Sequence, residues 1–218
     1  MTFSALEFLS KADPALGNLI DRIGPYQLVS ETRRSPFESL VRAVAHQQLH
    51  GKAAETILCR FIALFPSRRF PKPEDLLTVP DALIRGAGFS GSKVLAIRDI
   101  AAKTLDGTVP TSRRIAAMED SAIIDRLVQC RGVGRWTVEM LLIFKLGRLD
   151  ILPVDDFGVR EGFRVTYGLE KQPKPSELRI YGESWRPFRT VAAWYLWRAA
   201  DAAKEMRRGS APRPLDLG

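Results

Sequence analysis

An acidic pair and two tryptophans are the side chains of this sequence best suited to chemistry. Asp155 and Asp156 follow a short extended-looking segment and precede a predicted helix. Aspartate in that place is usually only a helix cap, but a fixed carboxylate also stabilises positive charge that develops on a reacting group. Trp136 precedes Asp156 by 20 residues, and Trp197 lies in the last predicted helix. Indole faces attract cationic rings, although a single tryptophan belongs more often to the core.

Two closely spaced glycines predict a tight turn between two helices. Apolar residues repeat at helical spacing within residues 123–142, and the segment Arg131-Gly132-Val133-Gly134 interrupts them. Glycine permits positive φ angles and a close approach of backbones. The second helix begins at the glycines, so its unpaired N–H groups and the positive end of its dipole favour a phosphate. An ordinary αα-hairpin with a glycine turn explains the spacing about equally well.

Helices are the elements predicted to position these residues. The 218-residue chain is 45% hydrophobic and 27% charged, as expected for a globular protein with a real core. Helical periodicity dominates, and no run alternates as a strand does. We therefore predict an all-α fold of about ten helices in two packed lobes with a cleft. Residues 1–208 are expected to form this single domain and residues 209–218 a flexible tail.

Cap and turn signals locate the helices along the chain. Ser35, Pro36 and Glu38 form an N-terminal signature in which serine caps, proline takes the first position and glutamate reaches back. A short break near His50 and Gly51 separates that helix from the next. Further helices are predicted by periodicity at residues 73–78, 80–86, 113–118, 121–130, 135–146, 175–184 and 187–208.

Charge and cysteine content restrict the class of protein. A net charge of +8 suits a polyanionic partner such as nucleic acid, or an anionic membrane, or is simply a basic surface. Cys59 and Cys130 are the two cysteines and neither belongs to a CxxC pair, which argues against a disulfide scaffold, a cysteine-rich zinc site and an iron–sulfur cluster. Thiols suit a reducing cytoplasm. We expect neither a signal peptide nor a membrane span.

Three segments in register resemble the DNA-3-methyladenine glycosylase II (alkylpurine) branch of the helix-hairpin-helix DNA glycosylase superfamily. They are RGVGRWT at 131–137, LPVDD at 152–156 and WRPFR at 185–189 with Trp197 beyond it. The resemblance extends from about Pro36 to Ala203, most of the chain. Two departures stand out: Met140 occupies the place of a pocket tyrosine, and the chain has no room for an extra N-terminal β-rich domain.

The resemblance implies roles for the candidate residues. Asp156 would be the catalytic carboxylate and Asp155 its neighbour and helix cap, with Asp155 as catalyst in an alternative register. Trp136 and Trp197 would enclose a flipped base. Phe157 and Met140 are weaker candidates for the lining of the same pocket.

The implied activity is that of a monofunctional DNA N-glycosylase, which flips alkylated bases of the 3-methyladenine and 7-methylguanine type and hydrolyses their bond to the sugar. Cleavage passes through an oxocarbenium-like sugar that Asp156 would stabilise. Bifunctional relatives carry a nucleophilic lysine where this chain has Trp136. Two alternatives remain: a non-catalytic helix-hairpin-helix DNA-binding protein, and a bifunctional glycosylase/lyase of the same superfamily.

The resemblance also implies the partners and ions. The partner is double-stranded DNA containing alkylated bases, bound by a monomer in the cytoplasm of a bacterium at its nucleoid, with no membrane contact. No cofactor is required. Hairpin amides would grip the DNA backbone, whereas main-chain carbonyls would hold a Na⁺ or K⁺ ion. The DNA-binding residues are Arg131, Gly132, Val133, Gly134 and Arg135, and the carbonyls belong to Val128, Cys130 and Val133.

Two further loops are assigned to DNA contacts. The string GAGFSG at 86–91 is no dinucleotide motif, because it lacks a βαβ context. With Lys93 it resembles a loop of alkylpurine glycosylases, which makes Gly88, Ser90 and Lys93 a second DNA contact. The loop after His46 resembles the one that fills the gap left by a flipped base, with Gln48 or Leu49 as the wedge. His46 and His50 have zinc-like spacing but no evident third ligand.

Overall fold

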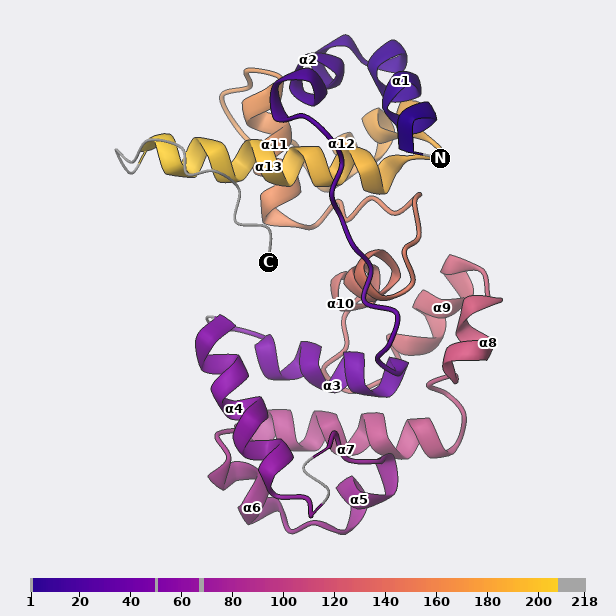
Figure 1. Cartoon of the computed structure of the whole chain (residues 1–218), viewed down its shortest axis with the longest axis vertical. Coiled ribbons are helices and arrows are strands. Elements are labelled where there is room, and N and C mark those ends of the chain that lie inside the picture. The colour runs from indigo at the N-terminus through magenta and orange to yellow at the C-terminus, as the bar shows by residue number, and fades with distance from the viewer. Residues whose placement is uncertain (1, 50, 67–68, 208–218) are drawn as a thin grey trace. The chain divides into compact units, whose positions relative to one another are not determined.

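The computed structural model is helical throughout the part of the chain that it describes, which comprises residues 2–49, 51–66 and 69–207 (Figure 1). Within these ranges the structure contains thirteen α-helices, one π-helical turn, one 3₁₀ turn and no strand. The all-α prediction is therefore confirmed. The predicted tail at 209–218 and His50 lie outside the described residues.

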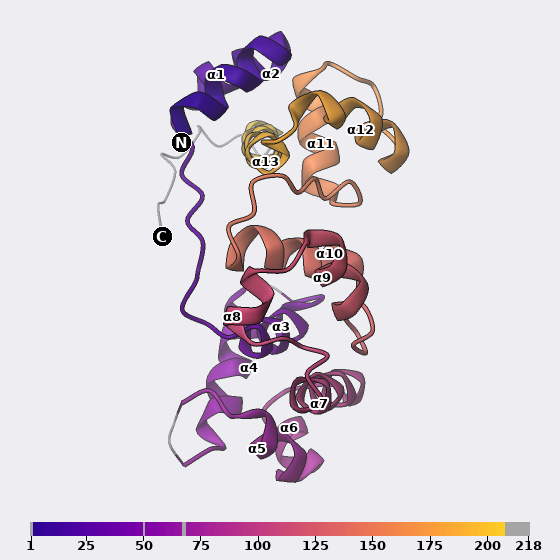
Figure 2. The ribbon, with the colours of Figure 1, turned by 90° about the vertical axis from the view of Figure 1, so that its right-hand side faces the viewer.

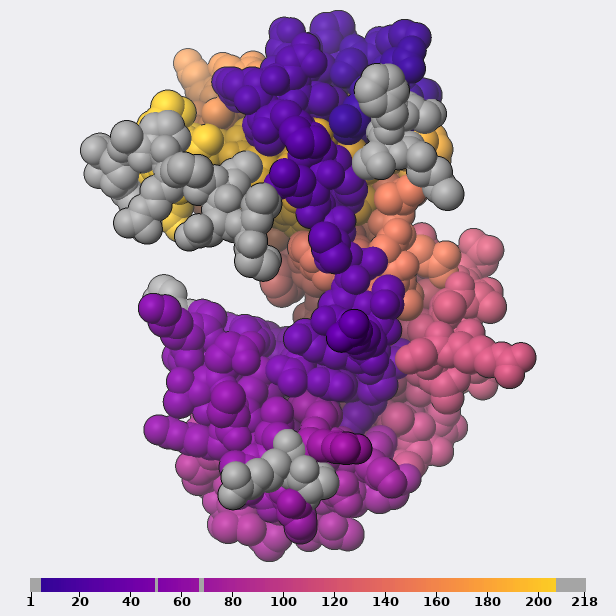
Figure 3. Space-filling view, in the orientation of Figure 1, coloured from indigo at the N-terminus to yellow at the C-terminus, as the bar shows by residue number. Residues whose placement is uncertain are grey.

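The chain divides into two compact units. The central unit contains residues 30–146, and the terminal unit combines residues 1–29 with residues 147–218. Residues 24–35 contain no helix, and their side chains are exposed or half-buried, as the space-filling view illustrates for this stretch of chain (Figure 3). The boundaries between the two units follow residues 29 and 146, and the sequence patterns did not predict them.

The central unit packs around one long helix. This helix, α7 (Gly91–Leu105), lies between α3 on one side and the pair α5 and α6 on the other (Figures 1 and 2). The remaining elements of the unit are α3 (Pro36–His46), α4 (Gly51–Ala63), α5 (Pro73–Thr78), α6 (Asp81–Gly86), α8 (Ser112–Ala116), α9 (Asp120–Leu127), α10 (Arg135–Met140) and the π turn η1 (Leu141–Lys145). Helix α3 begins where predicted, because Pro36 takes the first turn and Ser35 Oγ accepts the N–H of Glu38 at 3.1 Å. The predicted return contact of Glu38 is replaced by an ion pair, in which its Oε1 accepts from Arg42 Nε at 2.9 Å.

The terminal unit is built on α13 (Arg189–Arg207), which packs against helices on both sides (Figure 2). Its other elements are α1 (Thr2–Ala12), α2 (Pro14–Ile23), α11 (Phe157–Thr166), α12 (Pro175–Tyr181) and the 3₁₀ turn η2 (Gly182–Trp185). Buried Asp13 joins three of these elements: it caps α2 and also accepts hydrogen bonds from Tyr167 Oη and from Trp185 Nε1. This one carboxylate satisfies donors from segments distant in the sequence.

One predicted helix differs in its second half. The sequence predicts an uninterrupted helix over 135–146, whereas α10 ends at Met140 and continues as the π turn η1. Two contacts with the chain ahead of α3 accompany this change: Glu31 N donates to Phe144 O at 2.7 Å, and buried Lys145 donates from Nζ to Thr32 O at 2.8 Å. Such contacts between distant segments override a local period.

Candidate active site

The glycine turn forms the hairpin that the sequence predicts. Helix α9 ends at Leu127, and α10 begins after Gly134. Gly132 has φ 74°, a left-handed conformation that favours glycine. Gly134 is the N-cap of α10 and offers no capping side chain, while the 4%-exposed Val133 anchors the turn in the core. The helix-hairpin-helix prediction is thereby confirmed, with exposed backbone on both glycines.

The inner side of the hairpin is fixed by Asp99 of α7. Asp99 Oδ2 accepts the N–H of Arg131 at 2.7 Å and also binds Lys103 Nζ at 2.7 Å. Burial on its own would raise the pKa of Asp99, but these hydrogen bonds bring that pKa below its ordinary value. The backbone N–H of Arg131 is therefore bound to Asp99 within the protein. The exposed side chain of Arg131 is the group of this residue that suits a phosphate.

The loop after α3, residues 47–49, is attached to the hairpin. Gln47 donates from Nε2 to Gly132 O at 2.9 Å. Gln48 has φ 58° and is the one residue other than glycine with a positive φ in the described ranges. A side chain held in this unfavourable conformation is a frequent sign of a functional loop. Gln48 and Leu49 are both exposed, so two of the predicted DNA-contacting segments lie on one unit and are directly connected.

The second predicted DNA loop, with Gly88, Ser90 and Lys93, is held by contacts within the central unit. Ser90 caps α7, because its Oγ accepts the N–H of Lys93 at 3.3 Å. Gly88 has φ 116°, and a Cβ there would lie 2.8 Å from Cγ1 of Ile57. Lys93 donates from Nζ to the carbonyls of Ala45 and Gln47, both at 2.8 Å, and burial lowers the pKa of Lys93. Ser90 and Lys93 thus have identified partners within the central unit.

Asp156 and Trp197 form the centre of the candidate site in the terminal unit. Asp156 is the N-cap of α11, where its Oδ1 accepts the N–H of Val159 at 2.9 Å and Nε1–H of Trp197 at 2.8 Å. The prediction that Asp155 is the helix cap is wrong, since Asp155 is exposed and lies one residue too early. Asp156 is half-buried, and the two donors from Val159 and Trp197 orient its carboxylate.

Two glycines make this pairing possible. A Cβ on Gly158 would lie 2.8 Å from Trp197 Cδ1, and one on Gly162 would lie 1.8 Å from Leu196 O. The absence of both side chains therefore lets α11 approach α13 closely enough to bring Asp156 to the indole. Neither glycine was among the residues predicted for the site, although two glycines four positions apart leave one face of a helix without side chains.

The other pocket candidates are divided between the units. Trp136 is 45% exposed and Met140 is half-buried, and both lie on α10 of the central unit. Phe157 is 70% exposed and belongs to the terminal unit with Asp156 and Trp197. Each unit thus carries its own part of the predicted base pocket. That Trp136 and Asp156 converge on one base stays a prediction.

A cavity of about 210 Å³ in the central unit adjoins the predicted base-contacting helix. Met140, Thr137 and Leu141 line it together with His46, whose Nε2 lies 3.2 Å from Glu55 Oε1. The sequence patterns placed His46 at the start of the predicted gap-filling loop, with zinc-like spacing to His50, but did not predict a cavity beside it. Among the described residues no group of three or more His, Cys, Asp or Glu side chains is placed to hold a metal.

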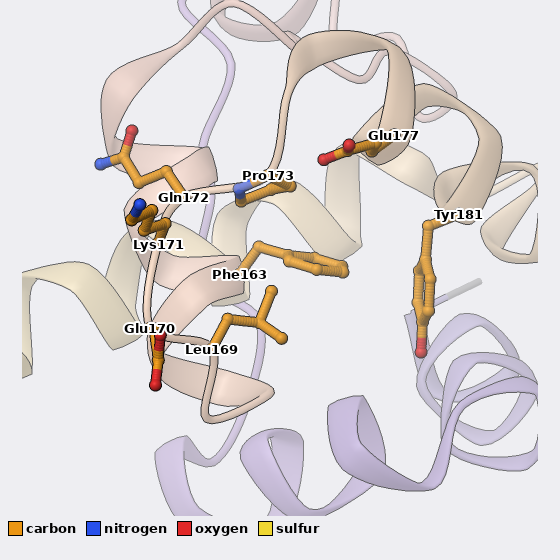
Figure 4. Close-up of a pocket in the computed structure, with 8 residues that line it drawn as sticks. All are labelled: Phe163, Leu169, Glu170, Lys171, Gln172, Pro173, Glu177 and Tyr181. Atoms are coloured by element: carbon orange, nitrogen blue, oxygen red, sulfur yellow. The ribbon is translucent and has the colours of Figure 1, made fainter.

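A larger cavity, of about 570 Å³, opens in the terminal unit between α11 and α12. Figure 4 shows Phe163 near the centre and Tyr181 at one side, together with the charged side chains of Glu170, Lys171 and Glu177. None of the residues predicted for catalysis, base binding or DNA contact lines it. Size alone therefore does not make this cavity the candidate site.

Fold and site first define a class: an all-α protein in which a glycine hairpin is followed along the chain by an aspartate that caps the next helix. The family of HhH-GPD superfamily base excision DNA repair proteins matches residues 41–187. The chain belongs to this family. No helix in residues 2–49, 51–66 and 69–207 is long and apolar enough to cross a membrane.

Similar proteins point to one branch of the family. DNA-3-methyladenine glycosylase 1 of Schizosaccharomyces pombe is 40% identical over 203 residues, 91% of this chain and 89% of that protein. The structure of S. pombe 3-methyladenine DNA glycosylase (Mag1) in complex with abasic DNA has a TM-score of 0.81 and covers 89% of this chain and 95% of that one. A DNA-3-methyladenine glycosidase from Bacillus halodurans has a TM-score of 0.83 at 34% identity, covering 92% and 91% of the two chains. The resemblance to the alkylpurine branch is confirmed.

Proposed function

We propose that the protein is a DNA N-glycosylase that excises alkylated purines in base excision repair. The observation that carries this proposal is the carboxylate of Asp156, half-buried and held by Trp197 Nε1–H at the start of α11. Capping α11 needs only the hydrogen bond from Val159 N, so the second hydrogen bond, from Trp197 Nε1–H, is the contact that favours a catalytic acid over a simple helix cap. Relatives named as 3-methyladenine glycosylases support the same activity.

The proposed reaction breaks the bond between the base and the sugar. The electron pair of that bond goes to the base, so a cationic alkylated purine leaves as a neutral molecule. Positive charge then develops on the sugar, where the negative charge of Asp156 stabilises it. Water adds to the sugar carbon and loses a proton, which completes the hydrolysis.

Selectivity is proposed to come from the two tryptophans. Stacking between the indoles of Trp136 and Trp197 favours a purine that carries a positive charge. Phe157 and Met140 complete the lining. Because position 136 holds an indole rather than a lysine amine, no Schiff base forms there, and the product is an abasic site in an uncut strand.

Binding to the duplex is proposed to use the central unit. The exposed glycines of the hairpin present backbone to a phosphate, and Arg131 adds positive charge beside them. Arg135 is also exposed, but its Nε is paired with the buried carboxylate of Glu139 at 3.0 Å. Gln48 and Leu49 fill the gap that the flipped base leaves. The attachment of Gln47 to Gly132 supports this arrangement, because it joins the two contact segments.

The hairpin is also proposed to hold a Na⁺ or K⁺ ion through main-chain carbonyls. Val128, Cys130 and Val133 would supply the oxygens, which are neutral hard ligands suited to monovalent cations. The donor set fits, although Cys130 O already accepts the N–H of Val133 at 3.0 Å. The positive charge of the ion would offset the negative charge of a DNA phosphate bound at the hairpin. The ion would take no part in bond cleavage.

We further propose that one copy of the chain acts on double-stranded DNA without a required cofactor. Each chain carries its own hairpin, aspartate and tryptophans, so no second copy is needed to supply a site residue. The site of action would be the compartment that holds the genome, which is the cytoplasm in a bacterium.

The experiment that tests this function is release of 3-methyladenine and 7-methylguanine from methylated duplex DNA. Wild-type protein should release both bases, and Asp156→Asn should lower the rate by a factor of about 10² or more. Asp155→Asn is the matched control, because it removes an exposed neighbouring charge and should retain activity. Wild-type protein that releases no alkylated purine would refute the proposal, and borohydride trapping of a covalent adduct would favour a lyase.

A further inference from the structure

Lys93 directs its ammonium group into the protein. Its Nζ donates to Ala45 O and Gln47 O, both at 2.8 Å, from a half-buried position on α7. Ala45 lies in the last turn of α3, where main-chain carbonyls have no partner further along the helix. A cation at that end also complements the negative end of the helix dipole. Lys93 therefore neutralises the end of α3 where the loop begins.

The loop that follows α3 has a second attachment. Gln47 Nε2 donates to Gly132 O of the hairpin at 2.9 Å, and Leu49 N donates to His46 O at 3.2 Å. Between these contacts Gln48 holds φ 58°. A residue with a Cβ keeps this conformation only where its surroundings impose it. Lys93 on one side and the hairpin on the other provide such surroundings.

We propose that Lys93 is a positioning residue, which holds the loop of residues 47–49 in the conformation that presents Gln48 and Leu49 to DNA. This inference rests on the proposed function for the use of the loop. It replaces a direct contact between Lys93 and a phosphate, because two carbonyls already bind the ammonium. The lysine would then affect how a base is flipped and leave the strength of general duplex binding unchanged.

Lys93→Met tests the attachment without any need for catalysis. The thioether keeps the length of the side chain and removes its donors. Hydrogen–deuterium exchange measured by mass spectrometry should become faster in residues 43–49 and stay unchanged in residues 113–127. On undamaged duplex, the slope of log affinity against log salt concentration should equal the wild-type slope, whereas loss of a phosphate contact would lower that slope by about 1.

Excision kinetics test the consequence. Single-turnover release of 3-methyladenine by Lys93→Met should slow by about 10-fold or more, with unchanged affinity for undamaged duplex. Lys93→Arg retains charge and donors and should restore most of the rate. Gln47→Ala loosens the same loop without leaving a half-buried cation unpaired and should slow release in the same way. Lys11→Met, which removes one exposed charge outside the central unit, is the charge control and should leave the rate unchanged.

The outcomes separate this inference from the function on which it rests. A salt slope lowered by about 1 in Lys93→Met, or unchanged exchange in residues 43–49, would overturn the positioning role even if excision is robust. Wild-type protein without excision activity would instead refute the proposed function, while the exchange experiment would still decide whether Lys93 holds the loop.

Discussion

At the scale of single residues, the hydrogen bonds of Asp156 set the orientation of its carboxylate, whereas the proposed role in catalysis depends on the negative charge of that group. One oxygen of the carboxylate accepts both the N–H of Val159 and Nε1–H of Trp197. The helix end and the indole thus fix the direction of the group. Its negative charge is what the sugar needs. Trp197 consequently has two proposed tasks, as one wall of the pocket and as a hydrogen-bond donor to the acid.

Trp197→Phe separates these two tasks. The phenyl ring keeps an aromatic face but loses the donor, so Asp156 is no longer held by the indole. We expect the single-turnover rate to fall about 10- to 100-fold, with little change in affinity for duplex that contains an abasic site. Single-turnover kinetics and a binding titration would measure both quantities. An unchanged rate would mean that the hydrogen bond to Trp197 has no role in catalysis.

At the scale of elements, the close approach of α11 and α13 depends on glycine. Gly162 faces the backbone of Leu196, and a Cβ there would lie 1.8 Å from the carbonyl oxygen of Leu196. The backbone fixes the position of a Cβ, so no side-chain rotation can relieve this clash. Gly162→Ala therefore requires a shift of one helix. We expect it to lower the free energy of unfolding by about 3 kcal/mol or more.

Denaturant unfolding of Gly162→Ala would measure this loss as a lower midpoint. The matched control is Gly86→Ala, since a Cβ there meets nothing within 4 Å and alanine is favoured in a helix. This control should be neutral or stabilising. Equal stability of Gly162→Ala and wild type would contradict the described packing of the two helices.

The same elements explain what the sequence predicts well and what it does not. Local signals located the cap at Ser35 and the glycine turn, because each depends on neighbours within a few residues. The choice of Asp156 rested on the family resemblance, which placed the helix cap one residue too early, at Asp155. Lys93, Gly158 and Gly162 act on segments distant in the chain, and their partners follow only from tertiary packing. The π turn after Met140 likewise could not be predicted from nearby residues, because it accompanies contacts with residues 31 and 32.

At the scale of the whole molecule, a net charge of +8 should govern general binding to DNA. Counterion release makes such binding weaken steeply with salt, by about 10³-fold or more between 50 and 200 mM for a protein with six or more phosphate contacts. Asp156→Asn, which removes no cation, should keep the wild-type slope for undamaged duplex. Titrations at several salt concentrations would test this, and a salt-independent affinity would contradict the assigned hairpin contacts.

The central claim is that Asp156 faces a sugar that becomes positively charged. The most direct measurement compares the affinity for two duplexes, one with a cationic pyrrolidine in place of the target sugar and one with a neutral tetrahydrofuran. A site built for the transition state binds its charged mimic more tightly. We predict that wild-type protein prefers the pyrrolidine duplex by at least about 10² and that Asp156→Asn loses this preference. Equal affinity of wild-type protein for the two duplexes, or a preference that survives in Asp156→Asn, would contradict the account.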